Sequence, residues 1–134
     1  MNETELNRRE CLALLASTTF GQLAFTRDAL PAVVPARYIV YPEQILIHAT
    51  PALADARWKG GEVVALHASA FDDHQRYGWT VTVTGVGHRA GELRDAYAAP
   101  SAPWIAPGDG DLIALEVGLV CGERLGPPRD AQRT

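Results

Sequence analysis

The stretch RYGWTVTVTGVGHR, Arg76–Arg89, decides the fold. Within it, Trp79, Val81 and Val83 alternate with three threonines. A period of two is typical of a β-strand that turns one face to a core and the other away from it. We therefore expect a long strand whose tryptophan and valine face is buried and whose threonine face points outward.

The sequence on both sides of this stretch predicts further strands. Apolar runs occupy residues 20–26, 32–41, 45–50 and 62–71, and a last strand pattern covers residues 111–125. Turn signals at Asp28–Pro31 and Tyr41–Gln44 separate the first three runs. Gly118 or Gly122 is expected to bend the last strand. A mainly β chain of about six strands, curved by glycine and proline, favours a small closed barrel.

Helices are expected at three places. The first lies within residues 1–18, with Thr4 as its N-cap and Ser17–Thr19 as its end, because hydroxyl side chains compete there for backbone hydrogen bonds. Short connecting helices are expected at residues 51–58 and 91–100. The polar residues 126–134 are interpreted as a flexible tail on a single domain that spans residues 1–134.

The composition excludes several classes of partner. Of the 134 residues, 47% are hydrophobic and 21% are charged, which is a globular balance, and the net charge of -4 disfavours nucleic acid and anionic membranes. No apolar run approaches the roughly 20 residues that span a bilayer. The first ten residues lack the apolar segment of a signal peptide, so we expect a cytoplasmic protein.

Three motifs are interpreted structurally. Cys11 and Cys121 form no CxxC pair, and we expect both to be small buried residues in a reducing compartment. Asp72-Asp73-His74 offers three possible metal ligands in one loop, but no second histidine pair stands at ligand spacing, so a solvated turn is predicted. Residues 85–91 have one residue too many for a dinucleotide fingerprint, and their glycines are attributed to strand curvature.

The order of these segments resembles the pyridoxamine 5'-phosphate oxidase-like, FMN-binding split-barrel proteins. The resemblance covers about Leu12–Leu125, and its most specific pieces are Gly78-Trp79 and the segment Pro103–Gly108. It implies a six-stranded Greek-key split β-barrel that forms a homodimer and holds FMN in a groove between the subunits. The outward threonines would then face the subunit interface.

The resemblance also implies a set of cofactor-binding residues. They are Arg37 and Tyr38 on one strand, His48, Ala49 and Thr50 at the end of the next, then Arg57 and Trp104. Arg37, Thr50 and Arg57 would anchor the phosphate, and Trp104 would stack near the ring. Leu53 and Ala54 stand where family members typically carry a Thr-Lys pair for the phosphate. Arg57 or Lys59 would have to replace that pair.

Two functions remain open at this point. The first is a flavin-dependent oxidoreductase, in which the cofactor carries the redox chemistry. The second is a non-catalytic dimeric barrel that has lost the cofactor, or one that binds haem or a deazaflavin. Oxidation of pyridoxamine phosphate itself is disfavoured, because the sequence is short of basic clusters for a second phosphate site.

Overall fold

The computed structural model describes residues 3–48, 60–89 and 112–126 of the chain. The expected helices at residues 51–58 and 91–100 and the tail beyond residue 126 lie outside the described residues. The elements are β1 (Glu3–Glu5), α1 (Arg8–Ala16), β2 (Phe20–Arg27), β3 (Leu30–Val40), β4 (Gln44–His48), β5 (Glu62–Asp72), β6 (Tyr77–Arg89), β7 (Leu112–Glu116) and β8 (Leu119–Leu125). The helix is not long and apolar enough to cross a membrane, and no other helix occurs in the described part of the chain.

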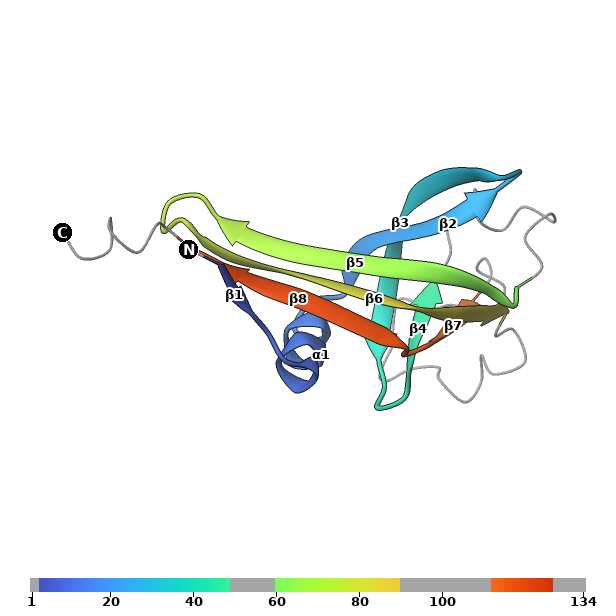
Figure 1. Cartoon of the computed structure of the whole chain (residues 1–134), viewed down its shortest axis with the longest axis horizontal. Coiled ribbons are helices and arrows are strands. Elements are labelled where there is room, and N and C mark those ends of the chain that lie inside the picture. The colour runs from blue at the N-terminus through green and yellow to red at the C-terminus, as the bar shows by residue number, and fades with distance from the viewer. Residues whose placement is uncertain (1–2, 49–59, 90–111, 127–134) are drawn as a thin grey trace.

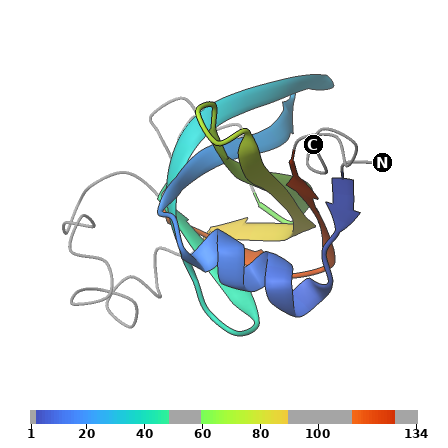
Figure 2. The ribbon, with the colours of Figure 1, turned by 90° about the vertical axis from the view of Figure 1, so that its left-hand side faces the viewer.

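Six of the strands close into an antiparallel barrel. The hydrogen-bonded order is β1-β8-β6-β5-β2-β3-β4-β7, and a further pairing of β6 with β7 joins the ends of the ring. Figure 2 shows this ring from one end, with α1 lying against it. β5 and β6 are the longest pair, and their hairpin extends beyond the barrel (Figure 1). The expected split-barrel architecture with an N-terminal helix is confirmed.

The strand of residues 76–89 faces as its alternation predicts. The side chains of Val81 and Val83 are fully buried and Trp79 is nearly so. Their neighbours across the pairing with β5 include Leu66 and Ala68, which are also buried, so these two strands build much of one wall of the core. The threonines at the alternate positions lie on the outer face.

The last strand pattern is divided in two, which corrects the expectation of one strand over residues 111–125. β7 pairs with Gly87–Arg89 at the end of β6, and β8 pairs with Gly78–Thr84 at its beginning. The chain crosses between them at Val117-Gly118, directly over Gly85. One edge of β6 therefore carries two consecutive strands, and the predicted bend lies at Gly118.

The N-terminal helix begins later than expected. Residues Glu3–Glu5 pair with β8 as a short strand, so Thr4 is not the N-cap. The N-cap is Asn7, whose side chain accepts a hydrogen bond from the Glu10 amide at 2.8 Å while the Glu10 carboxylate accepts one from the Asn7 amide at 3.0 Å. This reciprocal capping box is a stronger start signal than a lone threonine, because it satisfies two backbone donors. The helix ends before Ser17, as predicted.

The helix packs onto the barrel through its buried residues Cys11 and Leu15. A Cβ at Gly122 of β8 would lie 2.6 Å from the Cys11 sulfur, so only glycine leaves room for the helix there. Burial raises the pKa of the Cys11 thiol. Cys121, one residue before Gly122, points outward and is exposed, which corrects the expectation that both cysteines are buried. Adjacent residues of a strand face opposite sides, so a neighbour of Gly122 cannot share its inward position.

Candidate functional site

Arg37 and His48 lie opposite each other in the pairing of β3 with β4. The residues on both sides of Arg37, Ala36 and Tyr38, are buried inside the barrel, so the arginine side chain points to the outer face. His48 lies on the same face, because directly opposite residues of paired strands point to the same side of the sheet. Directly opposite residues on neighbouring strands have Cβ atoms about 5 Å apart. Two of the predicted site residues are thus brought together.

Phe20 extends this pair by one strand. It is the partner of Arg37 in the pairing of β2 with β3, and its ring is 57% exposed. The row Phe20–Arg37–His48 therefore places an exposed aromatic ring beside a guanidinium and an imidazole. The sequence analysis did not select Phe20, although its strand position indicated exposure. Phe20 and Gln22 lie at alternate positions and share one face of the strand, and the polar Gln22 marks that face as the outer one. An apolar ring in that phase is a candidate for contact with a ligand or partner.

Tyr38, the other predicted residue of β3, lies inside the barrel. Its side chain is fully buried, and its hydroxyl donates to the Leu15 carbonyl at 2.8 Å and also contacts the Thr18 hydroxyl. Burial raises the pKa of the Tyr38 phenol, and the bond with Thr18 opposes that effect in part. Arg37 and Tyr38 are adjacent on a strand, so their side chains point to opposite sides of the sheet. The tyrosine instead ties the core to the end of α1.

The remaining predicted residues, Ala49, Thr50, Arg57 and Trp104, lie outside the described residues. So do Leu53 and Ala54, the positions of the substituted phosphate pair. His48 is the last described residue of β4, and Ala49 and Thr50 follow it directly in the sequence. Their part in a site therefore stays a prediction.

The acidic loop between β5 and β6 has a structural use. One carboxylate oxygen of Asp72 accepts hydrogen bonds from the His74 amide at 2.9 Å and from the Gln75 amide at 3.1 Å. A side chain that bonds the backbone two and three residues ahead stabilises a turn. The Asp72 carboxylate is therefore engaged in holding the hairpin, in line with the turn that the sequence predicts.

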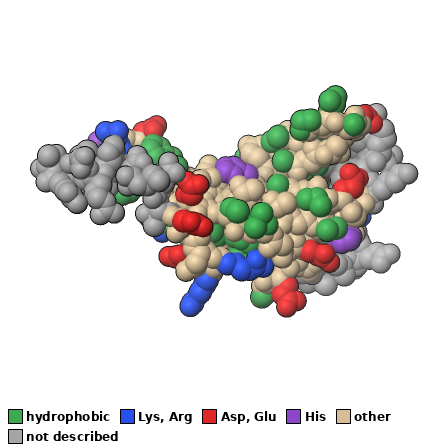
Figure 3. All heavy atoms as spheres, viewed as in Figure 1, with side chains coloured by type: hydrophobic (Ala, Val, Ile, Leu, Met, Phe, Trp, Pro, Cys, Tyr) green, Lys and Arg blue, Asp and Glu red, His purple; other side chains and the backbone are tan. Residues whose placement is uncertain are grey.

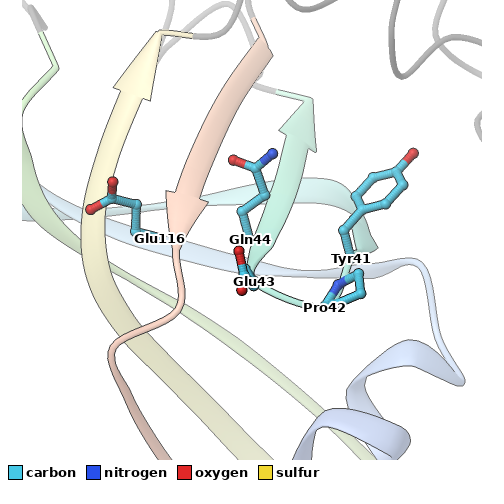
Figure 4. A pocket seen from close by; sticks show the side chains of 5 residues that line it. All are labelled: Tyr41, Pro42, Glu43, Gln44 and Glu116. Atoms are coloured by element: carbon cyan, nitrogen blue, oxygen red, sulfur yellow. The ribbon is translucent and has the colours of Figure 1, made fainter.

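A pocket of about 470 Å³ lies at the β3–β4 turn. Figure 4 shows its lining, in which Glu43 and Gln44 lie beside Glu116 of β7 and Tyr41 stands on the far side. The Glu116 carboxylate is 3.8 Å from the ring of His88, and both side chains are exposed. Because carboxylates repel a phosphate, this pocket is a poorer anion site than the row that contains Arg37.

Sequence comparison identifies the family. Residues 7–114 match the family model described as pyridoxamine 5'-phosphate oxidase. The chain belongs to this family. Within it, the chain is 33% identical over 132 positions to Rv0080 of Mycobacterium tuberculosis, described as an uncharacterized protein, and the match covers 90% of this chain and 84% of the relative.

Several solved structures of the same architecture are described as FAD-binding proteins. A FAD-binding protein from Mycobacterium smegmatis superposes with a TM-score of 0.67 at 20% identity, covering 92% of this chain and 98% of that one. A FAD-binding protein from Mesorhizobium loti superposes with a TM-score of 0.71 at 19% identity, covering 94% and 100%. At 19–20% identity, this likeness shows that the chain shares the fold of these two proteins.

Proposed function

We propose that the protein binds a flavin, FMN or FAD, and uses it as the redox cofactor of an oxidoreductase that works as a homodimer in the cytoplasm. The observation that carries the proposal is the juxtaposition of Arg37 and His48 on one outer face. Family membership supports a flavin in general, and the sequence resemblance favours FMN. Deazaflavin and haem are the alternative cofactors.

The donors of this row suit the anionic part of a flavin nucleotide. A guanidinium presents a planar fork of N–H groups that matches phosphate oxygens, and an imidazole adds a further donor. In this proposal Arg37 and His48 hold the phosphate, and Thr50 and Arg57 complete the anchor. Phe20 and Trp104 are the aromatic side chains available to flank the ring.

The bound flavin would supply hydride or electron transfer. The chain would contribute anchoring and orientation, which agrees with the lack of a nucleophile motif in its sequence. We assign the Tyr38 side chain no contact with the flavin in this proposal, because its hydroxyl is bonded within the core. The two free cysteines fit a reducing compartment such as the cytoplasm.

The second candidate function is that of a non-catalytic barrel without a cofactor. Leu53 and Ala54 favour it, because two small or apolar side chains replace the usual Thr-Lys pair and remove one charge from the phosphate anchor. A phosphate monoester with nearly two charges needs cationic or amide partners. The two candidates therefore differ in whether Arg37 and His48 can hold the phosphate of the nucleotide without the usual Thr-Lys pair.

A visible absorption spectrum of the purified protein, followed by fluorescence titrations with FMN and with FAD, separates the candidates. Saturable quenching supports a flavoprotein, and Arg37→Ala is then expected to weaken binding about 10- to 100-fold, as loss of a charged hydrogen bond does. Arg9→Ala, on the exposed side of α1, is the matched control and should leave affinity unchanged. Equal affinity of both variants would reject this anchor. A colourless protein that ignores both flavins would favour the cofactor-free barrel.

A further inference from the structure

A second pocket, of about 320 Å³, lies where the β5–β6 hairpin extends beyond the barrel. It is called here the hairpin pocket, and its lining includes side chains of the hairpin and of β8: Ala70, Asp72, Tyr77, Trp79 and Arg124. Figure 3 shows hydrophobic side chains on this hairpin as well as over the barrel. Binding sites for small molecules are concave, mainly apolar and at least about 300 Å³ in volume. The hairpin pocket is therefore large enough to hold a small ligand.

The strand pairing places these side chains on the inner face of the hairpin. Trp79 of β6 pairs with Ala70 of β5 on one side and with Arg124 of β8 on the other. Directly opposite residues point to the same side of the sheet, and the Trp79 side chain belongs to the core. Tyr77 lies two residues before Trp79 and shares its face. The hairpin pocket therefore continues the inner face of the barrel at the point where the core ends.

Two aromatic rings form the apolar part of the hairpin pocket. Trp79 is held by the core and is only 9% exposed, whereas Tyr77 is 49% exposed. Ala70, directly opposite Trp79, carries only a methyl group, so this pairing leaves space beside the indole. Aromatic rings prefer offset-stacked or edge-to-face contact with another ring. This part of the pocket therefore favours a flat aromatic ligand.

Arg124 supplies the positive charge of the hairpin pocket. Its side chain is exposed, and its guanidinium makes no ion pair with another described residue. Glu123, its neighbour on β8, points to the opposite face of the sheet, because successive side chains of a strand alternate. A guanidinium presents a planar fork of N–H groups that matches the two oxygens of a carboxylate. Arg124 is therefore available to bind an acidic group of a ligand.

Asp72 is the one acidic residue among the described residues that line the hairpin pocket. It lies on β5, two strands away from Arg124 and one same-face step farther along the hairpin, which separates the two Cα atoms by roughly 12 Å. One of its carboxylate oxygens accepts hydrogen bonds from the amides of His74 and Gln75. These bonds offset part of its negative charge, so the end of the pocket at Arg124 remains suited to an anion.

We propose that the hairpin pocket binds a small planar aromatic carboxylate, with the ring of the ligand against Trp79 and Tyr77 and its carboxylate on Arg124. The aromatic rings and the guanidinium act on different parts of the ligand, so an acid without an aromatic ring and an aromatic cation should both bind more weakly. This site is separate from the proposed flavin site. Arg37 lies on the outer face of β3, three strands from β6 in the sheet. The inference therefore does not depend on a bound flavin.

Isothermal titration calorimetry of the full chain with sodium benzoate tests the proposal. Saturable binding with a Kd on the order of 0.1–1 mM is expected, because a one-ring ligand has few atoms with which to make contacts. Cyclohexanecarboxylate carries the same charge without an aromatic ring, and benzylamine carries the ring with the opposite charge. Both should bind at least about 10-fold more weakly than benzoate.

Two substitutions separate the contribution of charge from that of shape. Arg124→Gln removes the charge and should weaken benzoate binding about 10-fold or more, as loss of a charged hydrogen bond does. Ala70→Leu fills the space beside Trp79 and should abolish saturable binding. Arg76→Gln, in the turn of the same hairpin, removes another exposed charge and is the matched control, with unchanged affinity expected. Circular dichroism verifies that each variant is folded.

Four outcomes would overturn the inference. Absence of saturable benzoate binding to the folded, unaltered chain rejects the site. Equal losses in Arg124→Gln and Arg76→Gln assign the binding to general attraction of charge. Equal affinity for the three ligands rejects the preference for an aromatic carboxylate. Loss of benzoate affinity in Arg37→Ala, with Arg124→Gln unaffected, places the acid at the flavin row instead.

Discussion

Gly85 of β6 lies directly beneath the backbone carbonyl of Glu116, where β7 gives way to β8. A Cβ at Gly85 would stand only 1.8 Å from that oxygen. The connection between β7 and β8 therefore requires a residue without a side chain at position 85. Because Gly85 allows this close approach, the same edge of β6 pairs with β7, which closes the barrel, and with β8.

Gly85→Ala is expected to destabilise the fold severely, by about 3 kcal/mol or more, because the backbone at the crossing would have to move. Urea unfolding followed by circular dichroism measures the change. Gly61→Ala is the matched control: its φ is +79°, but apart from its chain neighbours no atom in the described part of the chain lies within 4 Å of the added methyl, so only backbone strain of about 1–2 kcal/mol is expected. Equal losses in the two variants would show that the close contact is unimportant.

Tyr38→Phe is expected to cost about 1 kcal/mol of stability, because the Leu15 carbonyl loses the 2.8 Å hydrogen bond from the Tyr38 hydroxyl and keeps the longer ones from Thr18, at 3.3 and 3.4 Å. Flavin affinity should be unchanged, since the ring lies inside the barrel. Paired unfolding and flavin titrations test both statements. A large loss of flavin affinity with normal stability would return this tyrosine to the cofactor site.

Alkaline pH should destabilise the protein through the same tyrosine. The pKa of Tyr38 is raised above its ordinary value of 10.0 in the folded state. Above about pH 10 the unfolded chain has lost this proton while the folded chain retains it, so the free energy of unfolding falls as pH rises. Unfolding midpoints between about pH 9 and pH 11 should decline less steeply for Tyr38→Phe than for the unaltered chain. Parallel declines would assign the effect to other groups.

The two cysteines should differ in reactivity. Cys121 is exposed and should react with a thiol reagent within minutes, whereas Cys11 is fully buried with a raised pKa and should react only on unfolding. Mass spectrometry of the labelled chain, with and without denaturant, counts the modified thiols. Prompt labelling at Cys11 would mean that α1 detaches readily from the barrel.

The sequence alone was sufficient for elements whose signal is local. The alternation of Trp79, Val81 and Val83 predicted both the strand and its buried face, because side chains of a strand necessarily alternate between its two sides. The hairpin turn before Gln44 was predicted equally well, since Pro42 restricts the backbone whatever the rest of the chain does. The family resemblance depended on such local segments and was confirmed.

Only the tertiary structure showed the features that depend on which strands pair with each other. Nothing local to residues 111–125 shows that their two halves pair with different parts of β6 or that Gly85 must admit the crossing. The N-terminal strand forms only because β8 offers it an edge, and this pairing moved the helix start to Asn7. The row Phe20–Arg37–His48 likewise arises from the register of strands distant in sequence. Alternation determines which way a side chain faces, whereas only long-range hydrogen bonding of the backbone determines its neighbours.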